Sequence, residues 1–172
     1  MTNIIQLGNP KLRQIAQSIV DIQDESVQQL IDTLMLKVVD ANGVGIAAPQ
    51  IAQSWRLFIV ASRPNLRYPD APNMEPTAMI NPKIVTHSQE TVKAWEGCLS
   101  VPGIRGLVPR YQHIEVEYTD RKGKKQCCEL SGFVARIFQH ELDHLDGIVF
   151  VDRLETTNDL VTEQEYWRLV AS

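Results

Sequence analysis

The spacing of apolar residues predicts one amphipathic helix near the start of the chain. Five apolar side chains recur at helical spacing, which places them on one face. They are Val27, Leu30, Ile31, Leu34 and Val38. Asp24 or Ser26 can cap the first turn, and Asn42-Gly43 is a typical stop signal. We therefore expect a helix that packs one side on a core.

Extended segments and one loop follow this helix. Residues 43–50 are too rich in Gly, Ala and Pro for a helix and predict a tight loop or a short strand. Prolines and turn-forming residues mark 62–75 as a surface loop. A turn at residues 120–123 joins the last two predicted strands into a hairpin. The predicted strands, rich in β-forming residues, cover 56–61, 77–85, 113–118 and 124–130.

A second helical pattern, from Gly132 to Leu145, is apolar on nearly all sides, so this helix is expected to be central and buried. A final helix is predicted at Thr162, where Thr162-Glu163-Gln164-Glu165 matches a capping box. Strands lie on both sides of the buried helix in the sequence. This order predicts an α+β fold, with antiparallel β-sheets packed around the central helix and a helix at the C-terminus.

Composition and charge narrow the class of protein. The chain has 172 residues, 44% of them hydrophobic and 22% charged, which is typical of a single globular domain over residues 1–172. A net charge of -4 argues against nucleic acid as a partner, since its binders carry a basic face. No apolar stretch reaches the roughly 18 residues that cross a membrane, and the start lacks a secretory layout. We expect a cytoplasmic protein.

The strongest chemical signal is His140-Glu141-Leu142-Asp143-His144. Histidines at i and i+4 stand one turn apart on one face of a helix, so both imidazoles can reach one metal ion. Glu141 lies beside the first histidine and can act on a metal-bound water. The alternative is a chance histidine pair, but a polar pair on so apolar a helix is costly without partners. The motif therefore predicts a metal site.

A catalytic metal normally has a third protein ligand and one open position. Cys98 is a candidate, because it follows the flexible Gly97 and a thiolate is a strong ligand for first-row metals. An inert buried cysteine is the alternative interpretation. Asp152 and Glu155, downstream of the helix, compete for the role, as a carboxylate does in zinc peptidases. The spacing alone leaves the third ligand open.

Three separated segments resemble the signature motifs of the peptide deformylases, in the order of that family. They are Gly43-Val44-Gly45-Ile46-Ala47-Ala48-Pro49-Gln50, Glu96-Gly97-Cys98-Leu99-Ser100 and Gln139-His140-Glu141-Leu142-Asp143-His144. The resemblance extends from the first helix to about Leu154. It implies a metal-dependent hydrolase that removes the formyl group from the N-terminal methionine of new polypeptides and releases formate.

The resemblance also implies which residues hold the metal. Cys98, His140 and His144 would be the ligands of one divalent ion, and Glu141 would be general base and acid. The family typically uses Fe²⁺, and Zn²⁺, Ni²⁺ or Co²⁺ can take its place. A site of two histidines and one cysteine suits zinc equally well by its chemistry.

Backbone and side-chain groups near the metal have implied roles of their own. Gln50 and the backbone N–H of Leu99 would stabilise the oxyanion by the same resemblance. Without it, a loop glutamine is more often solvated. Gly45 and Gly97 would let the backbone close over the small formyl group, although turn formation accounts for them as well.

The methionine side chain needs an apolar pocket. Val44, Phe133 and Ile137 are expected to line it, because they lie beside the motifs, and ordinary core packing is the alternative. By the same resemblance, Glu96 would pair with an arginine, either Arg110 or Arg105, and so hold the loop that carries Cys98 in place.

Arg136 is a full charge one turn before His140 on the otherwise apolar helix. It is expected to lie at the pocket rim or to extend to solvent.

The implied partners are an N-formylmethionyl peptide substrate and, transiently, the ribosome. Some family members dock on ribosomes through a basic C-terminal helix. Here acidic residues outnumber basic ones after Asp152, so docking by that route is not expected.

Two rival functions remain at this stage. A zinc endopeptidase would use the same histidines and Glu141 with a carboxylate as third ligand. A non-catalytic protein would hold a structural metal in a closed four-ligand site. Neither rival explains all three segments.

Overall fold

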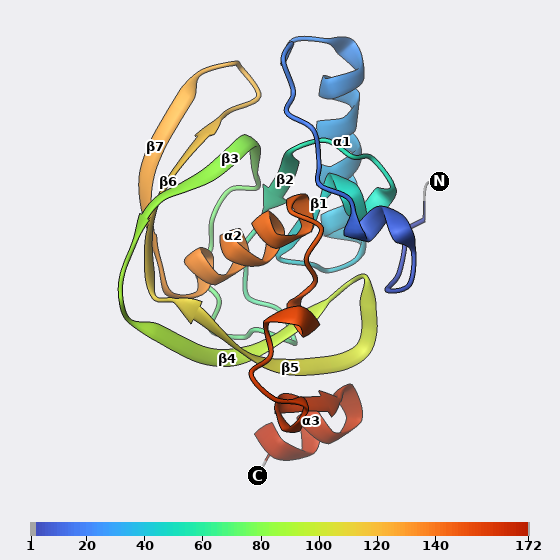
Figure 1. The fold of residues 1–172 in the computed structure, drawn as a ribbon, viewed down its shortest axis with the longest axis vertical. Coiled ribbons are helices and arrows are strands. Elements are labelled where there is room, and N and C mark those ends of the chain that lie inside the picture. Colours follow the sequence, from blue (N-terminus) through green and yellow to red (C-terminus); the bar gives the residue numbers. More distant parts are fainter. Residues whose placement is uncertain (1–2, 172) are drawn as a thin grey trace.

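Two antiparallel sheets surround one central helix in the structure, a computed structural model that describes residues 3–171 (Figure 1). The larger sheet has the order β1-β2-β3-β6-β7, and the smaller has the order β4-β5-β8. The strands are β1 (Gly45–Ala47), β2 (Leu57–Val60), β3 (Thr77–His87), β4 (Thr91–Cys98), β5 (Val101–Tyr111), β6 (His113–Thr119), β7 (Lys125–Ser131) and β8 (Leu160–Thr162). The helices are α1 (Glu25–Asp40), α2 (Gly132–Leu145) and α3 (Glu163–Val170). The predicted α+β class is confirmed.

The helix α1 forms where its apolar spacing places it. The Asp24 carboxylate accepts a hydrogen bond from the Ser26 N–H at 2.8 Å and caps the first turn. The apolar face of α1 packs on β1 and β2 in one core cluster with Ile46, Leu57 and Ile59. The predicted loop at 62–75 contains no helix or strand, and the four predicted strands correspond to β2, β3, β6 and β7.

The helix α2 runs through the middle of the molecule, as its all-round apolar pattern predicts (Figure 1). One side packs on the larger sheet, where the rings of Phe58 and Phe138 meet edge to face at 5.2 Å. The opposite side carries buried polar groups instead. They are Arg136, Gln139, Glu141, Asp143 and His144. Buried polar groups need partners, and the smaller sheet supplies them for Arg136, Gln139 and Asp143.

The long hairpin of β4 and β5 is the element that the apolar pattern does not predict. Glycines and prolines interrupt its sequence, and its exposed strand β4 lacks a regular alternation of burial. One glycine has a packing reason: a Cβ on Gly106 would lie 2.7 Å from the Phe150 ring. The hairpin therefore depends on contacts with the segment after α2, which local sequence does not reveal.

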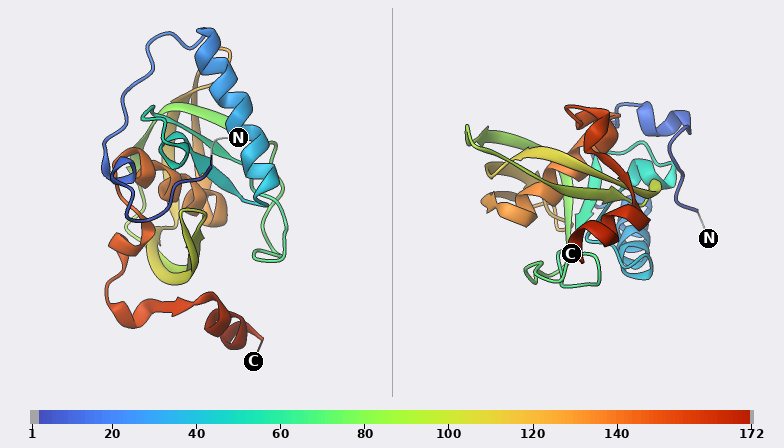
Figure 2. Two further views of the ribbon diagram at one scale, coloured as in Figure 1. Left: turned by 90° about the vertical axis from the view of Figure 1, so that its right-hand side faces the viewer. Right: turned by 90° about the horizontal axis from the view of Figure 1, so that it is seen from below.

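The chain ends at the outer side of the smaller sheet, where α3 lies next to β5 (Figure 2). The Thr162 hydroxyl accepts a hydrogen bond from the Glu165 N–H at 3.3 Å, so the predicted capped helix is confirmed. Within residues 3–171, each helix is too short or too polar to cross a membrane.

Candidate active site

Three predicted ligands meet between α2 and the β4–β5 turn. The Cys98 Sγ lies 3.2 Å from the His144 Nε2, and one donor atom from each of Cys98, His140 and His144 lies within 4.8 Å of the others. The two histidines share a face of α2, one turn apart. Cys98 ends β4 where the chain turns back into β5. The fold thus brings together Cys98 and His144, which are 46 residues apart in the sequence.

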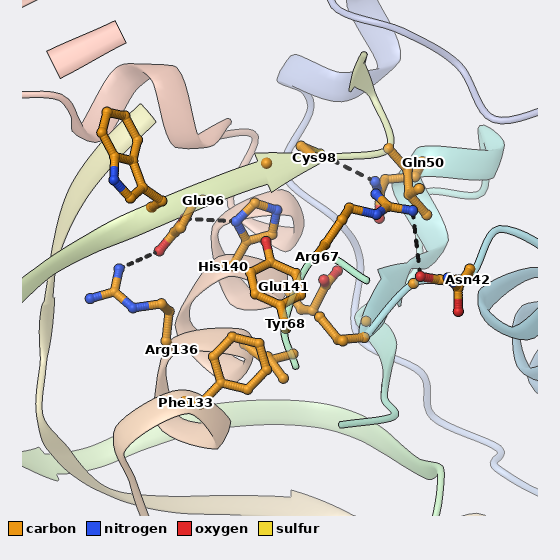
Figure 3. A pocket seen from close by; sticks show the side chains of 17 residues that line it. Asn42, Gln50, Arg67, Tyr68, Glu96, Cys98, Phe133, Arg136, His140 and Glu141 are labelled. Atoms are coloured by element: carbon orange, nitrogen blue, oxygen red, sulfur yellow. Dashed lines mark hydrogen bonds and ion pairs between the residues drawn. The ribbon is translucent and has the colours of Figure 1, made fainter. Parts of the chain in front are cut away.

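A buried carboxylate, Glu96, holds this arrangement together (Figure 3). It accepts hydrogen bonds from Arg110 at 2.9 and 3.0 Å, from Arg136 at 2.8 Å and from the His140 Nδ1–H at 2.8 Å. Burial by itself would raise the pKa of Glu96, but the Arg110 and His140 contacts outweigh it and hold that pKa well below its ordinary value. Glu96 is therefore ionised and fixes the orientation of the His140 ring.

Of the two expectations for Arg136, extension to solvent is wrong: the side chain is buried and lies among the residues that line the pocket. Its guanidinium donates to Glu96 and to the backbone carbonyls of Val92 and Val108, at 2.5 and 2.8 Å. Of the two candidate partners of Glu96, Arg110 is the one that binds it, while Arg105 contacts Glu163. A buried charge requires such compensation, which explains why the arginine on the apolar helix is tolerated.

The competing carboxylate ligands are bound elsewhere. Asp152 pairs with Arg13 and accepts from the Val149 N–H, and Glu155 pairs with Lys93 at 2.6 Å. Neither belongs to the group of donor atoms around Cys98. The geometry thus favours the thiolate as third ligand over a carboxylate.

Glu141 lies beside the three ligands with one oxygen unpaired. It is buried, and its Oε2 has no hydrogen-bond partner among the described residues. Burial raises the pKa of Glu141 to about 7, and a cation held by the three ligands would lower it again. A Cβ on Gly45 would lie 2.4 Å from the Glu141 Oε1, so only glycine leaves room for the carboxylate there. An unpaired buried carboxylate of this kind is suited to proton transfer.

Gln50 is buried and points into the site. It lies in a short 3₁₀ turn (Ala48–Ile51), and its Oε1 accepts from the Ala47 N–H at 2.8 Å. Its Nε2 donates to the Ser100 Oγ at 3.2 Å and lies 3.5 Å from the Cys98 Sγ. A solvated loop position is therefore excluded, and an amide N–H faces the metal-binding group.

A pocket opens beside these groups (Figure 3). Its walls include the predicted residues Val44, Gly45, Gly97, Leu99, Phe133 and Ile137. They also include Tyr68, whose ring lies 4.8 Å from that of Phe133, and Arg67, which donates to the Ala41 carbonyl at 3.1 Å. The composition of residues 62–75 predicted a surface loop, so neither Tyr68 nor Arg67 was predicted to line the pocket. The one sequence feature that could have indicated them is an aromatic residue beside an arginine in a polar loop.

The donor set fits a transition-metal ion. A thiolate and two imidazoles suit first-row metals, and three protein ligands leave a position open for water. The carboxylate on the His140 Nδ1 and the unpaired oxygen of Glu141 are what such a site requires.

The buried Glu96 charge yields a prediction about stability. Replacing Glu96 by Gln removes the carboxylate partner of the buried Arg136 and leaves Arg110 with Asp143 alone, so we expect the free energy of unfolding to fall by about 3–5 kcal/mol. Urea unfolding monitored by circular dichroism measures this. The control is Glu117→Gln, which breaks an ion pair with Lys83 whose carboxylate side chain is 46% exposed, and it should cost about 0–1 kcal/mol. Equal losses in the two variants would contradict the bracing role of Glu96.

Comparisons with known proteins show which family this chain resembles. The family model described as polypeptide deformylase matches residues 1–159. A relative from Nostoc sp., peptide deformylase 2, is 69% identical over 167 residues, which cover 97% of this chain and 93% of that one. Peptide deformylase 2 of Shewanella oneidensis is 48% identical, with 94% and 89% covered. The Met-Ala-Ser-bound structure of the class I type b peptide deformylase from Acinetobacter baumannii has a TM-score of 0.87 and 43% identity, with 90% and 100% covered.

Proposed function

The chain belongs to the peptide deformylase family and is a hydrolase that removes N-terminal formyl groups, and we propose that it does so with Glu141 beside a divalent metal. The observation that carries the proposal is the position of Glu141: a buried carboxylate with a free oxygen lies next to three convergent metal donors. The substrate is an N-formylmethionyl peptide, and the whole chain, residues 1–172, acts as one catalytic domain. The reaction takes place in the cytoplasm, in transient association with the ribosome.

Cys98, His140 and His144 would hold the metal, which would supply a Lewis acid and would lower the pKa of a bound water. Glu141 accepts a proton from the water that attacks the formyl carbon, and it then returns this proton to the departing amine. Formate and a peptide with a free amino terminus result. Fe²⁺ is the proposed ion, with Zn²⁺, Ni²⁺ or Co²⁺ as substitutes.

The oxyanion on the formyl group is stabilised by protein donors. The Gln50 Nε2 and the backbone N–H of Leu99 act in this role. Support comes from Gln50, whose Oε1 is fixed by the Ala47 N–H, so that its amide nitrogen is already oriented toward Cys98 before substrate arrives. Donors preorganised in this way are effective because they need no reorientation during the reaction.

The methionine side chain enters the apolar part of the pocket, between Val44, Phe133 and Ile137. A Cβ at Gly45 or Gly97 would collide with Glu141 or Arg105, so glycine at these positions leaves room for both side chains. The absence of a side chain there also lets the substrate backbone approach the reacting groups. Burial of a methionine side chain contributes roughly 1.5–3 kcal/mol, which is enough to select it over a small residue.

The proposed function is tested by formate release from formyl-Met-Ala-Ser, with protein prepared anaerobically with Fe²⁺ and acetyl-Met-Ala-Ser as the control. Anaerobic preparation protects the Cys98 thiolate from oxidation. We expect rapid release from the formyl peptide and none from the acetyl peptide. Absence of release from a fully metal-loaded protein would contradict the proposal.

The Gln50 donor can be tested separately. Replacing Gln50 by Leu removes the amide N–H, and we expect kcat to fall by about 10²–10³-fold with metal content unchanged, since this is the usual loss for one oxyanion donor. Gln53→Leu, at an exposed position three residues later, is the matched control. A kcat within twofold of the wild type in Gln50→Leu would sink the assignment.

A further inference from the structure

The C-terminal helix α3 follows the residues that the family model matches, which end at 159. It is joined to the catalytic part of the chain through β8, where Val161 is paired with Arg105 of β5. This register places the first residue of α3, Glu163, beside the Arg105 side chain. The contact therefore follows directly from strand pairing.

Arg105 is 3% exposed and is held by α3 from two directions. Its Nη2 donates to the Glu163 Oε1 at 2.6 Å, and its guanidinium lies over the Tyr166 ring, 5.3 Å from the centroid. A charge-assisted hydrogen bond and a cation–π contact both restrict the orientation of a guanidinium.

The other end of the guanidinium faces the substrate pocket. The Arg105 Nη1 donates to the Tyr68 hydroxyl at 3.3 Å. The same nitrogen would lie 2.3 Å from a Cβ on Gly97, so the guanidinium lies flat against the backbone just before Cys98. Tyr68 and Gly97 both line the pocket, and the Tyr68 ring packs on Phe133 (Figure 3). Arg105 thus touches α3 on one side and two pocket walls on the other.

We propose that Arg105, oriented by Glu163 of α3, is a positioning residue that fixes Tyr68 as a wall of the methionine pocket. The proposal rests on the proposed function, since it takes the pocket to hold methionine. Arg105 reaches none of the three metal donors or Glu141. Its loss should therefore weaken methionine binding and selectivity while the chemical step and the metal remain.

The variant Glu163→Gln tests this proposal, with Glu165→Gln as the matched control. Glu165 lies on the same helix at an exposed position, and among residues 3–171 its side chain pairs only with Arg168 of α3. Binding of the peptide Met-Ala-Ser to metal-loaded protein is measured by calorimetry, together with kcat and KM for formyl-Met-Ala-Ser. We expect Glu163→Gln to raise Kd and KM roughly threefold to tenfold, with kcat within twofold of the wild type. Glu165→Gln should match the wild type.

Two further measurements separate positioning from a purely structural role of α3. Selectivity for formyl-Met-Ala-Ser over formyl-Ala-Ala-Ser should fall in Glu163→Gln, because only the methionine side chain needs the Tyr68 wall. Tyr68→Phe should produce a similar fall, and the double variant should add little, since both changes break one chain of contacts. A lowered Tm with unchanged Kd and selectivity in Glu163→Gln would overturn the proposal. A wild type that binds Met-Ala-Ser but releases no formate from formyl-Met-Ala-Ser would instead contradict the proposed function, and the Kd comparison would still decide the role of Arg105.

Discussion

Replacing Glu141 by Gln is expected to lower kcat for formate release by about 10²–10⁴-fold, the usual contribution of a general base, while the protein keeps its metal. Gln preserves the size of the side chain and its place beside Gly45, but its amide cannot accept the proton of the attacking water. The metal donors are three other residues, so metal content should not change. Stopped assays of formate release and elemental analysis of the same sample measure both quantities.

The control for Glu141→Gln is Glu129→Gln, the same substitution at an exposed position on β7. It should leave kcat and metal content at wild-type values. Normal turnover by metal-loaded Glu141→Gln would show that another group takes the proton, and the assignment of the general base would be wrong.

The second large effect is expected for Cys98→Ala, which should lose its metal during dialysis and with it all formate release above background. Two imidazoles without the thiolate bind a divalent ion far more weakly, since catalytic sites normally use three protein ligands. Asp152 and Glu155 cannot compensate, because they are engaged by Arg13 and Lys93. Metal content is measured by elemental analysis after dialysis against a weak chelator.

The control for Cys98→Ala is Cys127→Ala, on the exposed face of β7. It should retain metal and activity. Full metal retention by Cys98→Ala would favour a site with a carboxylate ligand, as in the zinc peptidases.

The metal-binding helix was predictable from sequence because its signal is local. The spacing of His140 and His144 and the apolar residues around them define both the helix and its function. The third ligand was not predictable from spacing, because the turn that carries Cys98 is brought to α2 by tertiary contacts. The resemblance to the peptide deformylase motifs implied Cys98, and in the structure its Sγ lies within 4.8 Å of one nitrogen from each histidine.

The long hairpin of β4 and β5 and the direction of the Arg136 side chain could not be predicted from the sequence. Both depend on contacts between residues far apart in the chain. In the sequence, Gly106 interrupts the pattern of β-forming residues. In the structure, Phe150 packs against it, which explains the glycine. The partner of Arg136 is Glu96, on a strand 40 residues earlier in the chain. Likewise Tyr68 lies in a segment whose composition is that of an exposed loop, and only its contacts with Phe133 and Arg105 bring it to the pocket.

The four hydrogen bonds that Glu96 accepts restrict which substitutions the sequence can accumulate in evolution. One carboxylate satisfies donors on α2 and on β5 at once. A mutation at Arg110 or Arg136 alone removes one of the two arginines that neutralise the buried Glu96, whereas a joint exchange of the whole group for apolar side chains of similar volume would be tolerated by the fold. Such an exchange would also release the His140 ring. Single substitutions at these positions are therefore disfavoured by the loss of stability, and replacement of the whole group is disfavoured by the loss of His140 orientation. We expect these positions to vary together or not at all.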